Sequence, residues 1–308
     1  MSQLEALQAS EAMPLPPIAR EPRRWRPIPV AKAALFSAVL VGFSILFVYP
    51  FIWAVSASLK PQEEVFDNRL IPKHWAFHNW ADVFRIPDAP MFTWIWNSVW
   101  ISTVGALGVT FSSALIAFGF AYFRFPGRNV LFGVLLSTMM LPQEVTMIPT
   151  YLIWKHLGVI NHGGQYPLWV PNLFGSAFYV FLQRQFFLSI PRDYFEAARM
   201  DGDNYWTMFW RIAVPLAKPA LIVTFIFELQ AKWFDLLQPL IYLRDTALLT
   251  LPLGLKTILD SFGQSGGGQG DWQLIVAATV IAVIPMLAVF AVFQKYFLEG
   301  ISTQGRKG

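Results

Sequence analysis

The feature that most constrains this chain is a set of six apolar stretches. Each reaches the roughly 20 residues that a helix needs to cross about 30 Å of hydrocarbon. They lie near residues 33–55, 94–122, 130–153, 166–188, 219–243 and 272–298. Charged residues make up 14% of the chain, against about 25% in a soluble domain. The sequence therefore predicts an all-α integral membrane protein whose six transmembrane helices occupy residues 33–300.

The two ends of the chain and its basic residues predict how it is oriented. Residues 1–32 are rich in Pro and polar residues without a recurring apolar face, so we expect a disordered tail there, with a short second tail at 301–308. Placing both tails in the cytoplasm leaves about twice as many Lys and Arg residues inside as outside, as the positive-inside rule requires. The inner set then includes Arg124, Arg128, Arg184, Arg192 and Arg199.

The segment between the fourth and fifth stretches, residues 189–215, is too polar to cross a membrane and is predicted to form two short helices. Asp193 and Glu196 suit the positive N-terminal end of the first helix. Ala197 and Ala198 leave one side of it small enough to fit closely against another surface. We expect this segment on the cytoplasmic side, rigidly joined to the two neighbouring spans.

The turn between the two short helices is predicted at Gly202, which can end the first helix in the left-handed region. Asp203 can cap the second helix, whose aromatic residues suit the membrane interface. Pro215 then bends the chain toward the fifth stretch. Helix–glycine–helix is a common pattern, so these features alone are also compatible with a simple connector.

The spacing of the segment resembles the EAA loop in the permease subunits of bacterial ABC importers. Glu196-Ala197-Ala198 is followed after three residues by Gly202, and after nine more by the run 212–215, "IAVP". The run differs from the family pattern only in Val214, where Leu is usual. "NSVWIS", "LPQEVTMIPTYLIWKHLGVIN", "TLPLGL" and "QKYFLEGISTQGRKG" resemble maltose-type carbohydrate importer permeases, and particularly the six-span partner of the permease pair.

This resemblance implies a type I ABC importer permease in a bacterial inner membrane, with its loop helix acting as a coupling helix. The partners implied are a second permease in a heterodimer, two ATPase subunits and an extracytoplasmic sugar-binding protein, with no nucleic acid. ATP and Mg would be bound by the ATPases, so the chain itself would hold no cofactor and would not be an enzyme. The residues that the resemblance assigns to ATPase coupling are Glu196, Ala197, Ala198, Arg199, Asp201, Gly202 and Pro215. Glu196 would make the polar contact and the two alanines would fill a groove.

The fifth stretch carries Glu228, Lys232 and Asp235 at positions i, i+4 and i+7, which places them on one face of a helix. Each would cost at least about 2.5–3.5 kcal/mol if it faced lipid, so we expect them to face the bundle or a wet cavity. Two interpretations are open: a structural Glu228–Lys232 salt bridge, or a sugar path lined by these residues with Trp233 and with Asn172 of the fourth stretch. The alternative function is an ion-coupled secondary transporter that uses the three charges.

Other sites are not supported by the sequence. The chain has no cysteine, which excludes thiolate metal sites and Cys nucleophiles. His74 and His78 are four residues apart without a third ligand, so no metal site is expected. "SGGGQ" at 265–269 echoes the signature loop of ABC ATPases, but no Walker-type GK[ST] accompanies it. No Ser/His/Asp arrangement is apparent, and no catalytic residue is predicted.

Overall fold

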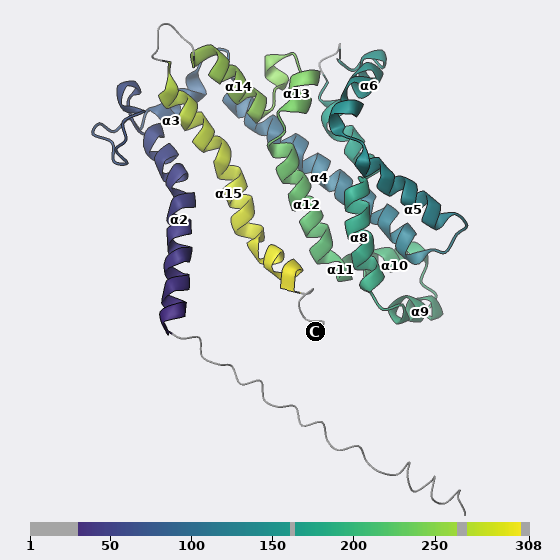
Figure 1. Ribbon diagram of the computed structural model, residues 1–308. Helices are drawn as coiled ribbons and strands as arrows, with labels where there is room; N and C mark the ends of the chain where they lie inside the picture. Colours follow the sequence, from purple (N-terminus) through teal and green to yellow (C-terminus); the bar gives the residue numbers. More distant parts are fainter. Residues whose placement is uncertain (1–29, 161–163, 264–269, 303–308) are drawn as a thin grey trace, which may run out of the picture. The chain divides into compact units, whose positions relative to one another are not determined.

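The computed structural model describes residues 30–160, 164–263 and 270–302, which form helices and no strand (Figure 1). The chain divides into two compact units, residues 1–50 and 51–308, and the division falls at Pro50 within α2 (Val30–Ser58). The all-helical prediction is confirmed for the described residues. The predicted tails up to residue 29 and from residue 303, and the segment 265–269, lie outside them.

The number of membrane spans differs from the prediction. Among the described residues, three helices are long and apolar enough to cross a membrane: Ala34–Ser58, Met91–Tyr122 and Trp272–Lys295. Two bent pairs qualify if each is counted as one span: Arg128–Met140 with Gln143–His156, bent by 97°, and Tyr205–Leu216 with Lys218–Trp233, bent by 78°. These residues therefore offer three to five spans by length and composition, and the predicted six is not confirmed.

The predicted third span is bent because of Pro142. Its elements are α5 (Arg128–Ser137), η3 (Thr138–Met140) and α6 (Gln143–His156). Leu141 is extended, with φ −78° and ψ 117°, as the ring of a following proline requires. The helix consequently stops before Pro142 and starts again immediately after it.

The predicted fourth span is broken by a glycine. Its elements are α7 (Tyr166–Trp169), η5 (Val170–Phe174) and α8 (Ala177–Ser189). Gly175 has a φ of +85°, in the region that favours glycine. A Cβ there would also overlap the Ile116 side chain of a neighbouring helix. The break leaves α8 too short to cross a bilayer by itself.

The long helix α4 (Met91–Tyr122) is the axis of the second unit, and it packs along α12 (Lys218–Trp233) and α8 (Figure 1). Around its beginning lies a hydrophobic cluster centred on Trp94, to which three further helices contribute. They are α13 (Leu237–Tyr242), α14 (Leu251–Phe262) and α15 (Trp272–Ser302). Gly254 of α14 lies against the Trp94 ring so closely that a Cβ would overlap it.

The shorter elements near this end are η1 (Gln62–Glu64), α3 (Asn79–Asp82), η2 (Val83–Arg85) and η7 (Thr246–Leu248). Both α3 and η2 pack on α15.

A second hydrophobic cluster surrounds the other end of α4, and it joins the segment 189–215 to the bundle. The elements of that segment are α9 (Asp193–Met200), α10 (Tyr205–Met208), the π-helical η6 (Phe209–Ala213) and α11 (Val214–Leu216). Phe118 is central to this cluster, with its ring centroid 5.4–6.0 Å from those of Phe187, Phe195 and Phe209. The segment is therefore packed against α4 by aromatic rings.

Candidate functional site

Helix α9 forms where the EAA-type pattern predicts a helix, and its ends explain its length. Asp193 and Glu196 lie in its first turn and Arg199 in its last, so each charge faces the favourable end of the helix dipole. Gly202 has a φ of +88°, which confirms the predicted left-handed turn. The amide of Gly202 donates to the Arg199 carbonyl at 3.2 Å and that of Asp203 to the Ala198 carbonyl at 2.9 Å. This pair of hydrogen bonds is a Schellman motif, which ends the helix.

The structure separates the two alanines that the sequence treats as one face. Ala198 is buried within the chain, together with Phe195. Ala197 is exposed, and so are Glu196 and Met200, the last with 84% of its surface accessible. The surface available for another subunit is therefore formed by Glu196, Ala197 and Met200, while Ala198 packs inward. Met200 was missed by the sequence reasoning, although its helical spacing from Glu196 could have indicated it.

Helix α9 is anchored through Phe195, whose ring lies 5.1 Å from that of Tyr122 and 6.0 Å from that of Phe118. The ring of Tyr205, at the start of α10, is 5.0 Å from the ring of Phe123.

The prediction that Asp203 caps the second helix is wrong. Asn204 is the cap, because its Oδ1 accepts from the Thr207 amide at 2.8 Å.

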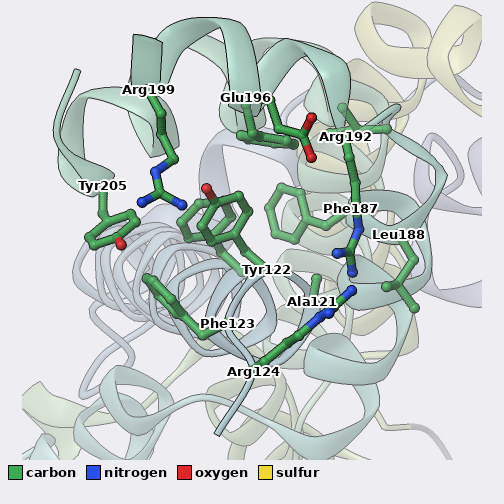
Figure 2. A pocket seen from close by; sticks show the side chains of 13 residues that line it. Ala121, Tyr122, Phe123, Arg124, Phe187, Leu188, Arg192, Glu196, Arg199 and Tyr205 are labelled. Atoms are coloured by element: carbon green, nitrogen blue, oxygen red, sulfur yellow. The ribbon is translucent and has the colours of Figure 1, made fainter. Parts of the chain in front are cut away.

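A cavity of about 370 Å³ lies between the ends of α4 and α8 and the inner side of α9 (Figure 2). Its lining is aromatic and basic, and it includes Tyr122, Phe123, Arg124, Phe187, Arg192, Glu196, Arg199 and Tyr205. Figure 2 shows Arg199 beside Tyr205 and, on the other side of the cavity, Arg192 beside Arg124. Ala197, Asp201, Gly202 and Pro215 are not among the lining residues.

The polar residues predicted for the sugar path separate into two groups. Asn172 donates through Nδ2 to Glu228 Oε1, and Tyr179 also interacts with that carboxylate. The side chains of Lys232 and Asn172 both lie against Gly105 of α4. A Cβ added to Gly105 would be 3.7 Å from an atom of each of them. Three helical segments, α4, η5 and α12, therefore bring these groups together. Tyr179 was missed, since nothing in its local sequence distinguishes it.

A salt bridge between Glu228 and Lys232, one of the two interpretations that the sequence leaves open, does not form. The described part of the chain holds four ion pairs, and this one is not among them. The Glu228 carboxylate instead has the Asn172 amide as its partner, which comes from another helix. Glu228 and Lys232 remain one turn apart on α12, so both face the same neighbours.

Trp233 and Asp235 lie apart from this group. Trp233 is 3% exposed, and its indole N–H donates to the Ala282 carbonyl of α15 at 3.3 Å, so it is a core residue. Helix α12 ends at Trp233, which means that Asp235 does not continue the helical face predicted for it. Its Oδ1 accepts from the Gln238 amide at 3.1 Å, in the manner of a cap for α13. Neither side chain supports the predicted path.

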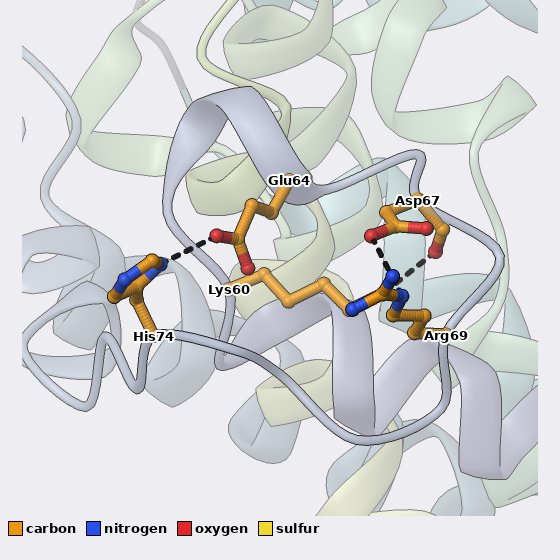
Figure 3. Close-up of polar contacts among 5 residues, drawn as sticks. All are labelled: Lys60, Glu64, Asp67, Arg69 and His74. Atoms are coloured by element: carbon orange, nitrogen blue, oxygen red, sulfur yellow. Dashed lines mark hydrogen bonds and ion pairs between the residues drawn. The ribbon is translucent and has the colours of Figure 1, made fainter.

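The long segment before α4 holds a polar network that the sequence did not predict (Figure 3). Lys60 is 1% exposed, and its Nζ donates to the Asp67 carbonyl at 2.8 Å. His74 Nδ1 lies 2.6 Å from Glu64 Oε1, and this hydrogen bond holds the pKa of the Glu64 carboxyl below its usual range. Asp67 also pairs with Arg69 at 3.7 Å. Among the described residues, no group of His, Cys, Asp and Glu could hold a metal ion.

The chain matches a known family over most of its length. The family of inner membrane components of binding-protein-dependent transport systems matches residues 108–303. The arabinooligosaccharide transport permease AraQ of Bacillus subtilis is 33% identical over 269 residues, which cover 86% of this chain and 92% of AraQ. The sn-glycerol-3-phosphate transport permease UgpE of Yersinia enterocolitica is 30% identical over 274 residues, covering 87% and 95%.

A solved structure has a similar fold. It is a bacterial ABC transporter involved in the import of the acidic polysaccharide alginate, and one of its chains superposes with a TM-score of 0.76 at 25% identity. The similarity covers 87% of this chain and 97% of that one. The overall fold of this chain is therefore similar to that of a chain of a bacterial ABC importer.

Proposed function

The chain belongs to the inner membrane components of binding-protein-dependent transport systems, the permeases of ABC importers, and on this premise we propose how it works. It pairs with a second permease and two ATPase subunits and moves a carbohydrate into the cytoplasm by alternating access. Proteins of this family work with a partner ATPase and a binding protein. ATP and Mg bind to the ATPases, and both termini of this chain lie in the cytoplasm. Ion-coupled transport by Glu228, Lys232 and Asp235 is not supported by the family.

One observation carries the proposal: α9 has a firmly packed face and a free face. Phe195 and Ala198 are buried in the hydrophobic cluster around the end of α4, while Ala197 and Met200 are exposed. A force applied to the free face is therefore transmitted to the bundle through packed side chains. We assign Ala197 and Met200 to an apolar contact with the ATPase and Glu196 to a polar one. Gly202 sets the turn that holds the angle of α9.

A carbohydrate cargo is supported by two observations. AraQ is named for arabinooligosaccharide transport and the solved structure for alginate import, although UgpE is named for sn-glycerol-3-phosphate. The group formed by Asn172, Glu228 and Lys232 offers donors and acceptors that match the hydroxyl rim of a sugar. We therefore assign the cargo contact to Asn172, Glu228 and Lys232, without Trp233 and Asp235 of the path predicted from the sequence.

The test is a charged substitution on the free face of α9. In the intact transporter reconstituted into vesicles, we expect Ala197→Glu to leave membrane insertion unchanged and to lower ATP-driven sugar uptake by at least tenfold, about 1.4 kcal/mol. Ala81→Glu is the matched control, because Ala81 is an exposed helical alanine near the other end of α4. Full uptake by Ala197→Glu would contradict the coupling role. Loss of uptake with a protonophore while ATP is plentiful would contradict ATP-driven transport.

A further inference from the structure

Four arginines gather where α4 ends, where α5 begins and at the two ends of α9, and the coupling role of α9 does not use them all. They are Arg124, Arg128, Arg192 and Arg199. The cavity of Figure 2 adjoins a second cavity of about 450 Å³, and both are lined by Arg124 and Arg192. The second cavity is also lined by Gly127, Arg128 and Val130 of the α5 start. These two arginines therefore join the two cavities into one basic site.

The charge of this site is not balanced within the described part of the chain. Glu196 is the one carboxylate among the lining residues, and none of the four ion pairs of the described residues involves an arginine of the site. Figure 2 shows the side chains of Arg124 and Arg192 extending toward each other. Two guanidinium groups placed in this way repel unless an anion lies between them. A phosphate is well suited, because its oxygens accept paired hydrogen bonds from arginine.

The surroundings of the site indicate which phosphate compound binds. Val130, at the rim of the second cavity, is 70% exposed, and Leu131 and Val134 further along α5 are 53% and 57% exposed. The first turn of α5 contains no acidic residue, so the positive end of its dipole adds to the basic charge. A phosphate at the arginines thus lies directly beside an apolar helix face. This combination fits the headgroup and the acyl chains of one amphipathic molecule.

We propose that this site binds the phosphate of an anionic phospholipid whose acyl chains lie along the apolar face of α5. The proposal relies on the membrane placement given under Proposed function. The phosphate bridges Arg124, just after α4, and Arg192, just before α9, so the lipid fastens the start of the coupling helix to the bundle. The ATPase is a less suitable occupant, because Ala197 and Met200 of the proposed ATPase contact line neither cavity, and Glu196 alone of that contact borders the first one.

The experiment is a lipid titration of the intact transporter, read by native mass spectrometry. Dioleoyl-phosphatidylglycerol is added to the detergent-purified complex, and dioleoyl-phosphatidylcholine serves as the zwitterionic comparison. In the variant Arg124→Gln/Arg192→Gln we expect the Kd of phosphatidylglycerol to rise at least about tenfold, because two charge-assisted contacts are lost. Phosphatidylcholine binding should not change. Arg124→Lys/Arg192→Lys should give an intermediate Kd, since it keeps the charge without the paired geometry.

The control variant is Arg85→Gln/Arg244→Gln, which removes two exposed arginines near the other end of α4 and should leave phosphatidylglycerol binding unchanged. An unchanged Tm of each variant in phosphatidylcholine verifies folding. Three results would overturn the proposal: wild-type phosphatidylglycerol affinity in the Gln variant, displacement of the lipid by equimolar inorganic phosphate, or lipid binding at these arginines only after the ATPases are removed. The last result would assign the site to the ATPase. The result of the uptake test of Ala197→Glu does not depend on any of these three results, so the lipid proposal and the coupling proposal can fail separately.

Discussion

The two ends of α4 are held by different kinds of interaction. At the beginning of the helix, Trp94 donates to the Thr246 carbonyl at 2.8 Å and Asn97 donates to two carbonyls of the same loop, both at 2.9 Å. Ser98 accepts from the Leu251 amide at 2.7 Å. These hydrogen bonds connect residues about 150 positions apart in the sequence, and they weaken steeply when their angles are distorted. This end of α4 and α14 should therefore move as one body.

At the other end of α4, the contacts are mainly between aromatic rings. Phe195 packs on Phe118 and Tyr122, and Phe209 packs on Phe118, with centroid distances of 5.1–6.0 Å and interplanar angles of 47–60°. Aromatic pairs are favourable in both offset-stacked and edge-to-face arrangements, with centroids about 4.5–7 Å apart, so rings can shift relative to one another at lower cost than breaking a buried hydrogen bond. The end of α4 that is joined to the coupling helix is therefore suited to small movements, while the opposite end is suited to remain fixed.

The largest expected effect is at the hydrogen-bonded end. Trp94 is 1% exposed and covers Gly254, so Trp94→Ala removes its packing and its hydrogen bond and leaves a cavity. We expect the free energy of unfolding in detergent to fall by about 5 kcal/mol, the upper end of the range for such changes. Trp75→Ala is the control, since Trp75 is 54% exposed and should change stability by less than about 0.5 kcal/mol. Equal losses in both variants would contradict the comparison.

A smaller loss of stability with a larger functional change is expected at the ring-packed end. Phe195 is 5% exposed but borders the cavity beside α9, so fewer atoms surround it than surround Trp94. We expect Phe195→Ala to cost about 3 kcal/mol and to detach α9, which should abolish uptake. Hydrogen exchange of α14 should stay at the wild-type rate, and a faster rate there would show that the two ends are not separate. Tyr194→Ala, at an exposed neighbour, is the control.

The sequence predicts the local features of the site correctly because each depends on neighbouring residues. The helix at α9 follows from its dipole-matched charges and small residues, and the left-handed turn follows from Gly202. The cap of the next helix was predicted one residue too early, at Asp203 in place of Asn204. Both residue types suit a cap, and only the geometry of the turn decides between them.

Features that depend on contacts between distant segments could not be predicted in this way. The partner of Glu228 is Asn172, 56 residues away, and its presence removes the reason for the expected pair with Lys232. Which of Ala197 and Ala198 is buried depends on where α9 lies relative to Phe118. The six expected spans assume straight helices, an assumption that fails wherever proline or a left-handed glycine breaks the backbone.

The turn at Gly202 provides a test of backbone strain without steric overlap. A Cβ at Gly202 would meet no atom within 4 Å, so Gly202→Ala should cost only the left-handed strain of about 1–2 kcal/mol, and Gly202→Asn less. Gly127 is the matched control, because it has a φ of +78° and equally open surroundings, and a methyl group there would leave Arg124 and Arg192 of the basic site in place. Gly127→Ala should lower the Tm by a similar amount while leaving the coupling of ATP hydrolysis to uptake intact. Uncoupling by both substitutions, or by neither, would contradict the special role of the Gly202 turn.

The smallest effect is expected at exposed His74 in the polar network before α4, and it depends on pH. The hydrogen bond from His74 lowers the pKa of Glu64 in the folded protein, so the ionised carboxylate stabilises the fold. This contribution is complete above the ordinary pKa of Glu, about 4.3, and it is lost as the pH falls through the lowered folded value. His74→Ala should therefore lower the Tm slightly at pH 6 but not at pH 3, whereas His78→Ala, at the exposed neighbouring histidine, should change neither. A difference between His74→Ala and wild type that grows toward pH 3 would show that the sign is wrong. Because this network lies near the hydrogen-bonded end of α4, uptake driven through α9 should stay the same in both variants.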